Sequence, residues 1–269
     1  MIDEDFEPII RRGDLKRYKD KDLFETVEEV FDTKTVMTIL YLMRKRIIRR
    51  MNGVISAGKE ARVYLGFGWK NEPLAVKIYL TSTAVFKKGM LKYIIGDPRF
   101  EDFKPGDTRD IIYAWTRKEF RNLKRMFNVG VKVPKPIAFK NNILVMEFMG
   151  ENNKRYPLLI EAYSHLSINE LRKIYEYILE ELFKTVCKAN LVHGDLSEYN
   201  IMIKPGPDIV IIDVSQAVHI DHPNSLEFLI RDINNINRFF REKVGLDELE
   251  NVDEILEVVK KCLRSKRED

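Results

Sequence analysis

The stretch LVHGDLSEYNIM, residues 191–202, places four polar side chains between apolar runs. They are His193, Asp195, Ser197 and Asn200. A buried carboxylate is costly unless it is paired or bound to a metal, so an ordinary core strand would not carry these groups. Two explanations fit the pattern: a surface turn whose side chains hydrogen-bond their own backbone, or a loop whose polar groups perform chemistry. The stretch alone does not choose between them.

The composition is that of a folded protein without a strong charge bias. The chain has 269 residues, 45% of them apolar, and its 46 basic and 42 acidic residues leave a net charge of +4. This balance does not by itself indicate nucleic-acid binding. Cys187 and Cys262 are far apart, so we expect neither a disulfide framework nor a cysteine metal site, and a reducing compartment fits. An acidic N-terminus and the lack of an apolar run of about 18 residues predict a cytoplasmic protein without a membrane span.

The first half of the chain has the pattern of a β-rich unit with helices. Apolar residues spaced by three and four predict a helix that is capped by Asp32 or Thr33 and stopped by Gly53. β-branched runs bounded by glycines predict a hairpin or meander at 53–80. The stretch 135–150 predicts two strands around an Asn-Asn turn.

The second half is predicted to be mainly helical. The helix that precedes the 135–150 strands still belongs to the first half: a long connection at 81–110 leads into it, and it stops at Gly130. After Gly150 the apolar run DIVIID predicts one strand, which closes on Asp213. Three helices are expected around it, at 169–187, 225–243 and 252–263.

Five polar residues spread along the chain have a common explanation. Lys77 lies in an apolar strand, Glu119 lies on the next helix, Asp195 and Asn200 share a loop, and Asp213 ends a strand. Phosphoryl transfer from ATP needs a cation on the phosphates, a carboxylate to hold that cation, a base near the acceptor hydroxyl and oxygen ligands for Mg²⁺. Singly, each residue has a simpler explanation, such as an edge lysine, a solvated glutamate, a turn or a helix cap. Because they occur in this order on suitable elements, together they predict an ATP-dependent phosphotransferase.

The same segments resemble the protein-kinase-like superfamily and, more narrowly, the RIO family of atypical serine/threonine protein kinases. SAGKEARVY (56–64), VHGDLSEYNIM (192–202) and IDVSQAV (212–218) are similar to that family's phosphate loop, catalytic loop and metal-binding loop. The Asp-Val-Ser-Gln of the third motif favours the RIO1 branch. The resemblance covers roughly residues 53–245 and implies an α+β, bilobal protein-kinase-like fold with a β-rich N-lobe, a helical C-lobe and an N-terminal helical extension. The implied domains are 1–52 for the extension, 53–149 for the N-lobe and 150–269 for the C-lobe.

The resemblance also implies a role for each site residue. Lys77 would contact the α- and β-phosphates of ATP and pair with Glu119, while Asp195 would orient or deprotonate the acceptor hydroxyl. Asn200 and Asp213 would ligate Mg²⁺ or Mn²⁺. Ser56, Gly58 and Lys59 would form a loop over the phosphates. Backbone groups of Glu147 and Met149 would form the hinge that contacts the adenine edge. Met202 and Ile212 would sandwich the adenine ring.

Several positions depart from an ordinary protein kinase. Gly194 replaces the arginine that senses activation-loop phosphate, and no Ala-Pro-Glu segment for substrate peptides follows Asp213. Ser197 stands where protein kinases usually place a lysine. We expect His193 to be a structural hydrogen-bonding residue, and Asp232 resembles the helix carboxylate that pins the catalytic loop. The resemblance implies transfer to Ser or Thr, of the chain itself or a partner. The missing peptide segment argues against ordinary peptide phosphorylation and motivates the alternative of transfer to water through a phosphorylated Asp213.

Two other functions remain open, together with the choice of partner. One is a small-molecule kinase of the choline or aminoglycoside type, although the stretch after Asp232 is short for its acceptor pocket. The other is an ATP-gated ribosome assembly factor with little transferase activity. RIO-like proteins are associated with small ribosomal subunit maturation, which implies a pre-small-subunit partner. The basic cluster at 44–50 is either a solvated helix end or a contact for ribosomal RNA phosphates.

Overall fold

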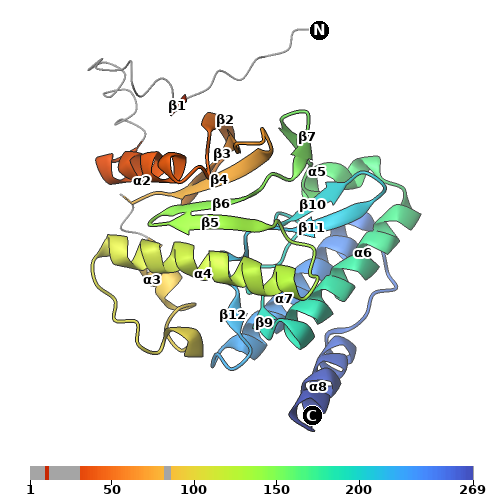
Figure 1. The fold of residues 1–269 in the computed structure, drawn as a ribbon. Coiled ribbons are helices and arrows are strands. Elements are labelled where there is room, and N and C mark those ends of the chain that lie inside the picture. Colours follow the sequence, from red (N-terminus) through yellow and green to blue (C-terminus); the bar gives the residue numbers. More distant parts are fainter. Residues whose placement is uncertain (1–9, 12–30, 82–85, 269) are drawn as a thin grey trace. The chain divides into compact units, whose positions relative to one another are not determined.

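A computed structural model describes residues 10–11, 31–81 and 86–268 of the chain (Figure 1). These residues fall into two compact units, each of which is described by itself. Unit 1 comprises Met1–Lys88, Pro105–Phe120 and Lys135–Arg155, and unit 2 comprises Gly89–Lys104, Arg121–Pro134 and Tyr156–Asp269. Of the predicted N-terminal helical extension, residues 1–9 and 12–30 lie outside the described part.

Unit 1 is built on a six-stranded antiparallel sheet with the strand order β1-β2-β3-β4-β6-β5. The predicted meander is confirmed as β2–β3–β4. The predicted hairpin is confirmed as β5–β6, and Asn141 enters its turn in the left-handed conformation, with φ of 52°. The strands of unit 1 are β1 (Ile10–Arg11), β2 (Arg50–Ala57), β3 (Ala61–Phe67), β4 (Pro73–Tyr79), β5 (Pro136–Lys140), β6 (Ile143–Glu147), β7 (Gly150–Glu151) and β8 (Lys154–Arg155).

Helix α2 (Thr33–Arg44) covers one face of this sheet (Figure 1). Asp32 caps it as predicted, accepting a hydrogen bond from the Thr35 N–H at 2.7 Å. The predicted end at Gly53 is wrong. The helix ends at Arg44 because Arg46 turns into the left-handed region with φ of 60°, and Gly53 lies inside β2. The inner side of α2 packs on the sheet through an apolar core that includes Val36, Ile39, Leu42, Met43, Tyr64, Val76, Ile78 and Val145.

Helix α4 (Thr108–Asn128) begins in unit 1 and continues into unit 2. Its predicted stop is confirmed at Gly130, which has φ of +81°. The long connection predicted before it contains two short helical segments, α3 (Phe86–Leu91) and η2 (Pro98–Phe100).

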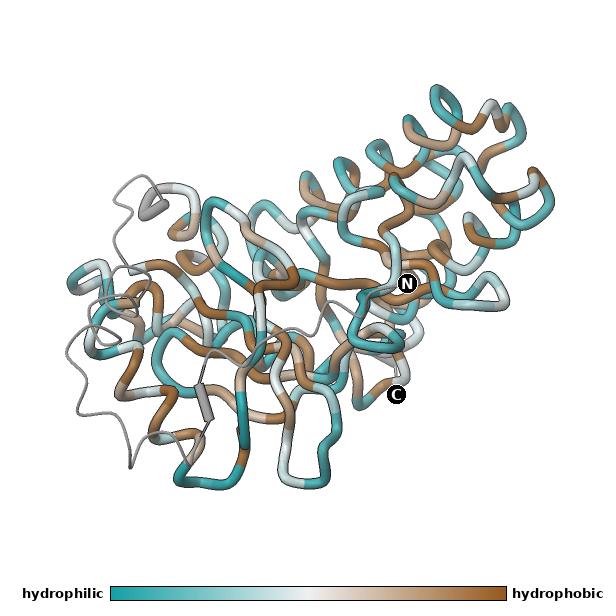
Figure 2. Tube along the Cα trace, turned by 90° about the horizontal axis from the view of Figure 1, so that it is seen from above, coloured by the Kyte–Doolittle hydropathy of each residue, from teal (hydrophilic) through white to brown (hydrophobic). Residues whose placement is uncertain are grey.

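Unit 2 is mainly helical, as predicted. Apolar positions recur along its longer helices (Figure 2), and α6 and α7 each bury the side that carries them. Strand β11 ends at Ile211, and Asp213 therefore follows the strand instead of closing it. The elements of unit 2 are α5 (Leu159–Ala162), η3 (Tyr163–His165), α6 (Ile168–Phe183), η4 (Lys184–Lys188), β9 (Leu191–Val192), β10 (Ile201–Lys204), β11 (Asp208–Ile211), η5 (Val214–Gln216), β12 (Val218–His219), α7 (Ser225–Phe239), η6 (Phe240–Val244) and α8 (Val252–Glu268).

A disulfide in unit 2 corrects one expectation from the sequence. It joins Cys187 of η4 to Cys262 of α8, whose Cα atoms lie 5.8 Å apart. The two cysteines are 75 residues apart in the sequence, but the packing of α8 against η4 brings them together. The expectation of no disulfide is therefore wrong, and cysteine usage no longer supports a reducing compartment. Within the described ranges, no helix has the length and apolarity that a membrane span requires.

Candidate active site

In unit 1, the lysine of the predicted phosphate site is held by a buried carboxylate. Lys77 on β4 donates from Nζ to Oε1 of Glu119 on α4 at 2.8 Å, and the two residues are only 7% and 1% exposed. The Tyr79 hydroxyl donates to the other oxygen of Glu119, and its ring centre lies 5.1 Å from the Lys77 ammonium. A buried ion pair is sustained when good geometry and additional hydrogen bonds offset its desolvation. These contacts therefore fix where the ammonium lies.

The predicted phosphate loop is the turn between β2 and β3. Ser56, near the end of β2, and Gly58 and Lys59, in the turn itself, are all exposed. The Gly58 N–H donates to the Ala61 carbonyl at 2.9 Å, which closes the turn. A Cβ on Gly58 would lie 3.3 Å from that same carbonyl oxygen, so glycine allows the backbone to close tightly here. The turn therefore offers a hydroxyl, a lysine and exposed backbone, which are groups that bind phosphate.

The predicted hinge lies at the end of β6. The Glu147 N–H donates to the Lys135 carbonyl at 2.9 Å, and the Glu147 carboxylate accepts from the Lys135 N–H at 3.2 Å. The Glu147 N–H is already hydrogen-bonded within the unit. Of the two backbone groups of Glu147, the carbonyl is therefore the one that we expect to contact adenine. Met149 follows at the same sheet end and is half-buried.

In unit 2, the loop between β9 and β10 brings Asp195 and Asn200 together. The Asn200 amide nitrogen donates to the Asp195 carbonyl at 2.8 Å and lies 3.5 Å from its carboxylate. Gln216 donates to the same carboxylate at 2.9 Å. Burial, followed by the charge of Asp213, raises the pKa of Asp195 above its ordinary value, while the Arg231 guanidinium acts in the opposite direction. An oriented carboxylate of raised basicity suits a group that receives a proton.

Helix α7 holds this loop at Gly194. The buried carboxylate of Asp232 accepts the N–H groups of Gly194 at 2.7 Å and Leu196 at 2.9 Å, which is the contact expected of it. The neighbouring Arg231 donates to the Gly194 carbonyl and, at 3.2 Å, to the Tyr93 hydroxyl. Two consecutive residues of α7 thus engage both backbone groups of Gly194. Arg231 and Gln216 are not among the residues predicted from the sequence, although Arg231 adjoins Asp232 and Gln216 lies within the motif IDVSQAV.

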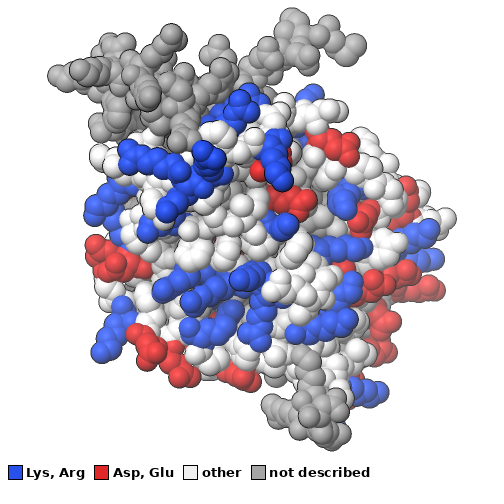
Figure 3. All heavy atoms as spheres, in the orientation of Figure 1, with Lys and Arg blue, Asp and Glu red and all other residues white. Residues whose placement is uncertain are grey.

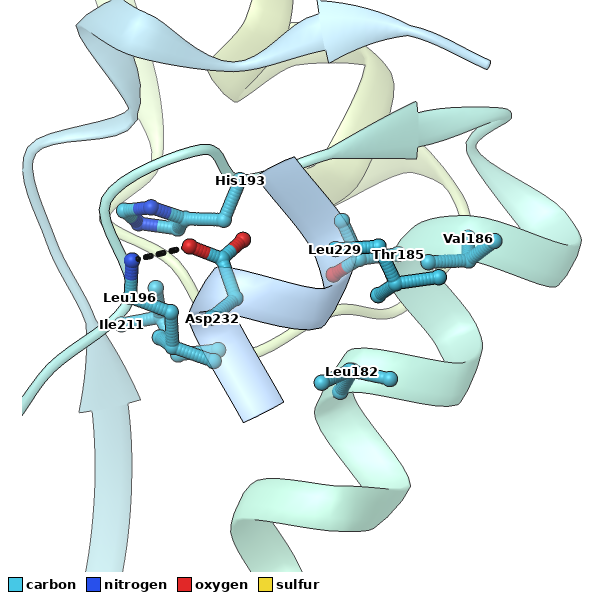
Figure 4. Close-up of a pocket in the computed structure, with 8 residues that line it drawn as sticks. All are labelled: Leu182, Thr185, Val186, His193, Leu196, Ile211, Leu229 and Asp232. Atoms are coloured by element: carbon cyan, nitrogen blue, oxygen red, sulfur yellow. Dashed lines mark hydrogen bonds between the residues drawn. The ribbon is translucent and has the colours of Figure 1, made fainter. Parts of the chain in front are cut away.

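A small cavity adjoins this anchor (Figure 4). Its volume is about 10 Å³, which is roughly the room that one water molecule needs. His193 and Asp232 border it among apolar side chains, and burial raises the pKa of Asp232 to about 7 against the opposing effect of its two amide hydrogen bonds. His193 Nε2 lies 3.3 Å from the Ile212 carbonyl, a hydrogen bond that agrees with a structural role.

The two predicted metal ligands offer oxygen atoms. The Asn200 amide nitrogen is engaged by the protein, so its amide oxygen is the atom that can ligate a cation. Asp213 is exposed and left-handed, with φ of 54°, and its Oδ1 accepts from Ser215 at 2.8 Å. One amide oxygen and one carboxylate fit Mg²⁺, which completes its shell with water and phosphate oxygens. Among the described residues, no group of three or more His, Cys, Asp or Glu could hold a metal by itself. The donor set thus fits a cation that arrives with phosphate.

The predicted adenine sandwich lies on the β10–β11 hairpin. Met202 pairs with Val210, and the Ile212 N–H donates to the Asn200 carbonyl at 2.9 Å. Alternation along the strands therefore places Met202 and Ile212 on the same face of the hairpin, and both are partly exposed. This apolar face is available to a planar ring.

Comparison with known proteins gives the family. A family model described as the RIO domain matches residues 62–254. The chain belongs to the RIO family. The RIO-type serine/threonine-protein kinase Rio1 of Haloferax volcanii is 41% identical over 249 residues, which cover 90% of this chain and 83% of that protein. The serine/threonine-protein kinases RIO1 of Caenorhabditis elegans and Homo sapiens are both 40% identical, over 94% and 86% of this chain, but the matches span only 49% and 40% of those longer proteins. The predicted RIO1 branch is confirmed, and the chain is a kinase of the serine/threonine type.

Solved structures confirm the fold. The Rio2 kinase of Chaetomium thermophilum, solved as an ADP/Mg²⁺-phosphoaspartate complex, has a TM-score of 0.62 at 21% identity and covers 82% of this chain and 64% of that chain. A second structure of the same kinase gives a TM-score of 0.60 at 21% identity, covering 83% and 66%. At this identity the likeness concerns the fold alone. The α+β kinase-like fold, with a β-rich and a helical part, is as predicted.

Proposed function

We propose that this RIO-family chain uses ATP with Mg²⁺ or Mn²⁺ and transfers the γ-phosphate to a Ser or Thr hydroxyl, its own or a partner's. The observation that carries the proposal is the buried pair of Lys77 and Glu119. A lysine fixed inside an apolar strand by a buried carboxylate matches the cation that phosphoryl transfer places on the nucleotide phosphates. Unit 1 would supply this phosphate contact, together with the loop at Ser56, Gly58 and Lys59.

Unit 2 would supply the acceptor and metal chemistry. Asp195 would accept the hydrogen bond of the acceptor hydroxyl and then its proton, since Gln216 donates to its carboxylate and Asn200 holds its backbone carbonyl. Asn200 and Asp213 would hold the cation, which screens the charge on the transferred phosphoryl group when bound. The apolar face of Met202 and Ile212 would contact adenine.

A second activity is supported by the exposure of Asp213. We propose that its carboxylate also attacks the γ-phosphorus, which forms an acyl phosphate and releases ADP, and that water then cleaves the acyl phosphate to inorganic phosphate. The related Rio2 kinase was solved as a complex with ADP, Mg²⁺ and a phosphoaspartate. Asp213 is exposed and left-handed, which supports access of a nucleotide to this residue.

Labelled ATP separates these activities. With [γ-³²P]ATP and Mg²⁺, we expect hydroxylamine-labile phosphate on Asp213, stable phosphate on Ser or Thr, and free phosphate in solution. Asp195→Asn should lower transfer to Ser or Thr by about 10²–10³-fold. Asp247→Asn, at an exposed carboxylate elsewhere in unit 2, is the control and should keep full activity. Label only on Ser or Thr would remove the acyl-phosphate route, and full transfer by Asp195→Asn would remove the assigned base.

We also propose a pre-small ribosomal subunit as partner and the cytoplasm as compartment, although the Cys187–Cys262 bond is of a kind that most cytosolic proteins lack. Support comes from the RIO family, whose members resemble this chain in motif and sequence. Sedimentation of the protein with immature small subunits, with ATP and with a non-hydrolysable analogue, tests the partner. We expect retention with the analogue and release with ATP; a protein that stays at the top of the gradient in both cases would exclude this partner.

A further inference from the structure

The outer side of α2 is cationic and aromatic. Residues 33–50 contain six basic residues and no acidic one. Exposed side chains recur along the helix at Lys34, Met37, Tyr41 and Lys45, spacings of three and four that place them on one side. We call this side, together with Lys140 at the end of β5, the α2 face. Figure 3 shows Lys and Arg side chains gathered over α2.

A pocket of about 280 Å³ opens on the α2 face. Helix α2, helix α4 and the β5–β6 turn all contribute to its lining. Met37 and Tyr41 are 53% and 41% exposed, so apolar and aromatic surface lies next to the lysines that line this pocket. The ammonium groups of Lys140 and Lys45 lie 5.2 and 5.7 Å from the Tyr41 ring centre. The pocket is lined by Thr33, Lys34, Met37, Thr38, Tyr41, Tyr113, Lys140 and Asn141.

The same combination continues past the end of α2. The Arg46 guanidinium lies 5.5 Å from the ring centre of Trp69, whose side chain is 39% exposed on the turn between β3 and β4. Arg44, Lys45 and Arg49 are exposed beside it in sequence. The surface thus presents two exposed aromatic rings, each with a cation close by.

The combination of cations and exposed aromatic rings favours one class of anionic ligand over another. An acidic peptide would match the cations, but it would gain little from two exposed rings. A single strand of nucleic acid matches both, because phosphates bind the cations and unpaired bases stack on aromatic faces. We propose that the α2 face binds single-stranded nucleic acid, with a base in the pocket against Tyr41 and backbone phosphates on Lys34, Lys45 and Lys140. None of these residues belongs to the candidate active site, so this proposal is independent of the phosphoryl-transfer proposal.

Stacking is tested by changing the ring. The full chain is titrated with a fluorescent RNA of about 15 nucleotides that cannot pair with itself, and with DNA of the same sequence, a length that spans the usual single-strand site. Tyr41→Ala should weaken binding about 5- to 100-fold, the value of one lost base stack, whereas Tyr41→Phe should stay within about twofold. Binding of RNA, of DNA or of both supports the site. The nucleic acid that binds with the higher affinity shows whether the site prefers ribose or deoxyribose.

The charge contribution is tested through salt. Removing two phosphate contacts by Lys34→Gln with Lys140→Gln should reduce the slope of log affinity against log salt by about 1.4. Lys260→Gln with Lys261→Gln, on the exposed side of α8, is the matched control and should leave the slope unchanged. Kinase activity should stay at the wild-type level in all these variants.

Three outcomes would overturn the proposal. They are equal affinities for Tyr41→Ala and the wild type, an unchanged salt slope without Lys34 and Lys140, and tighter binding of duplex RNA or a polyglutamate peptide than of either single strand. Urea midpoints equal to the wild type show that any loss of binding does not come from unfolding.

Discussion

Replacing Glu119 by Gln tests whether the buried ion pair in unit 1 holds its lysine in place. The variant keeps the shape of the side chain and an acceptor for Tyr79, but it removes the charge opposite Lys77. At 2.8 Å and an effective dielectric constant of about 20, the attraction between the two charges is about 6 kcal/mol, and desolvation of both groups offsets much of it. Removing one partner of a buried pair typically costs about 3–5 kcal/mol.

That cost is large against the total stability of a domain, which is about 5–15 kcal/mol. We therefore expect Glu119→Gln to lower the free energy of unfolding of unit 1 by about 3–5 kcal/mol, and Lys77→Met to do the same. The double variant should lose less than the sum of the single variants, because it leaves no buried charge without its partner. Transfer activity should fall in all three variants.

The assay is urea unfolding followed by tryptophan fluorescence. Both tryptophans of the chain, Trp69 and Trp115, belong to unit 1, so the signal reports on that unit. Glu72→Gln, at an exposed carboxylate of the same unit, is the control. Two results would refute the reasoning that burial makes each charge depend on its partner. One is a loss of less than about 1 kcal/mol in the free energy of unfolding for each single variant, and the other is a loss in the double variant equal to the sum of the single losses.

Three further predictions follow from unit 2. Arg231→Gln should move the acidic limb of the pH–rate profile to higher pH, because the guanidinium lowers the pKa of Asp195; Arg231→Lys should move it less, and an unmoved limb in both would contradict the assignment. Burial raises the pKa of Asp208, but hydrogen bonds from Lys132 and Lys204 outweigh burial and bring the pKa to about 2. The ionised carboxylate therefore stabilises the fold above its ordinary pKa of about 4, and this stabilisation is lost as the pH falls toward 2. Urea midpoints should show this loss, about 1 kcal/mol for a partly exposed pair, in the wild type but not in Asp208→Asn. Reduction of the Cys187–Cys262 bond should lower stability by about 2–4 kcal/mol, measured as a lower Tm that Cys262→Ser reproduces without reductant.

The sequence predicted those parts of the fold that local patterns determine. The strand around Lys77, the cap at Asp32 and the stop at Gly130 each depend on neighbouring residues, and each is confirmed. The end of α2 was predicted at the wrong place, because Gly53 is a strong local signal whereas the left-handed turn at Arg46 has no such residue type.

Contacts between distant residues were harder to predict from one sequence. The Cys187–Cys262 bond depends on where α8 packs, which no spacing of 75 residues reveals. Arg231 could be any solvated helix residue until α7 is placed against Gly194. The pairing of Lys77 with Glu119 was anticipated because a lysine inside an apolar strand needs a partner and because phosphoryl transfer needs a carboxylate to hold that cation; the family resemblance implied the same pair.

Gly194 limits how this kinase can be controlled. Its backbone is left-handed, with φ of +77°, and a Cβ there would lie 3.3 Å from the Gln216 carbonyl. An L-residue in this conformation costs roughly 1–2 kcal/mol, and the neighbouring carbonyl would also have to yield. Replacing Gly194 by arginine would therefore distort the loop between β9 and β10, which carries Asp195 and Asn200. A phosphate-sensing arginine at this position would therefore have to offset a conformational cost in the same loop that holds Asp195 and Asn200.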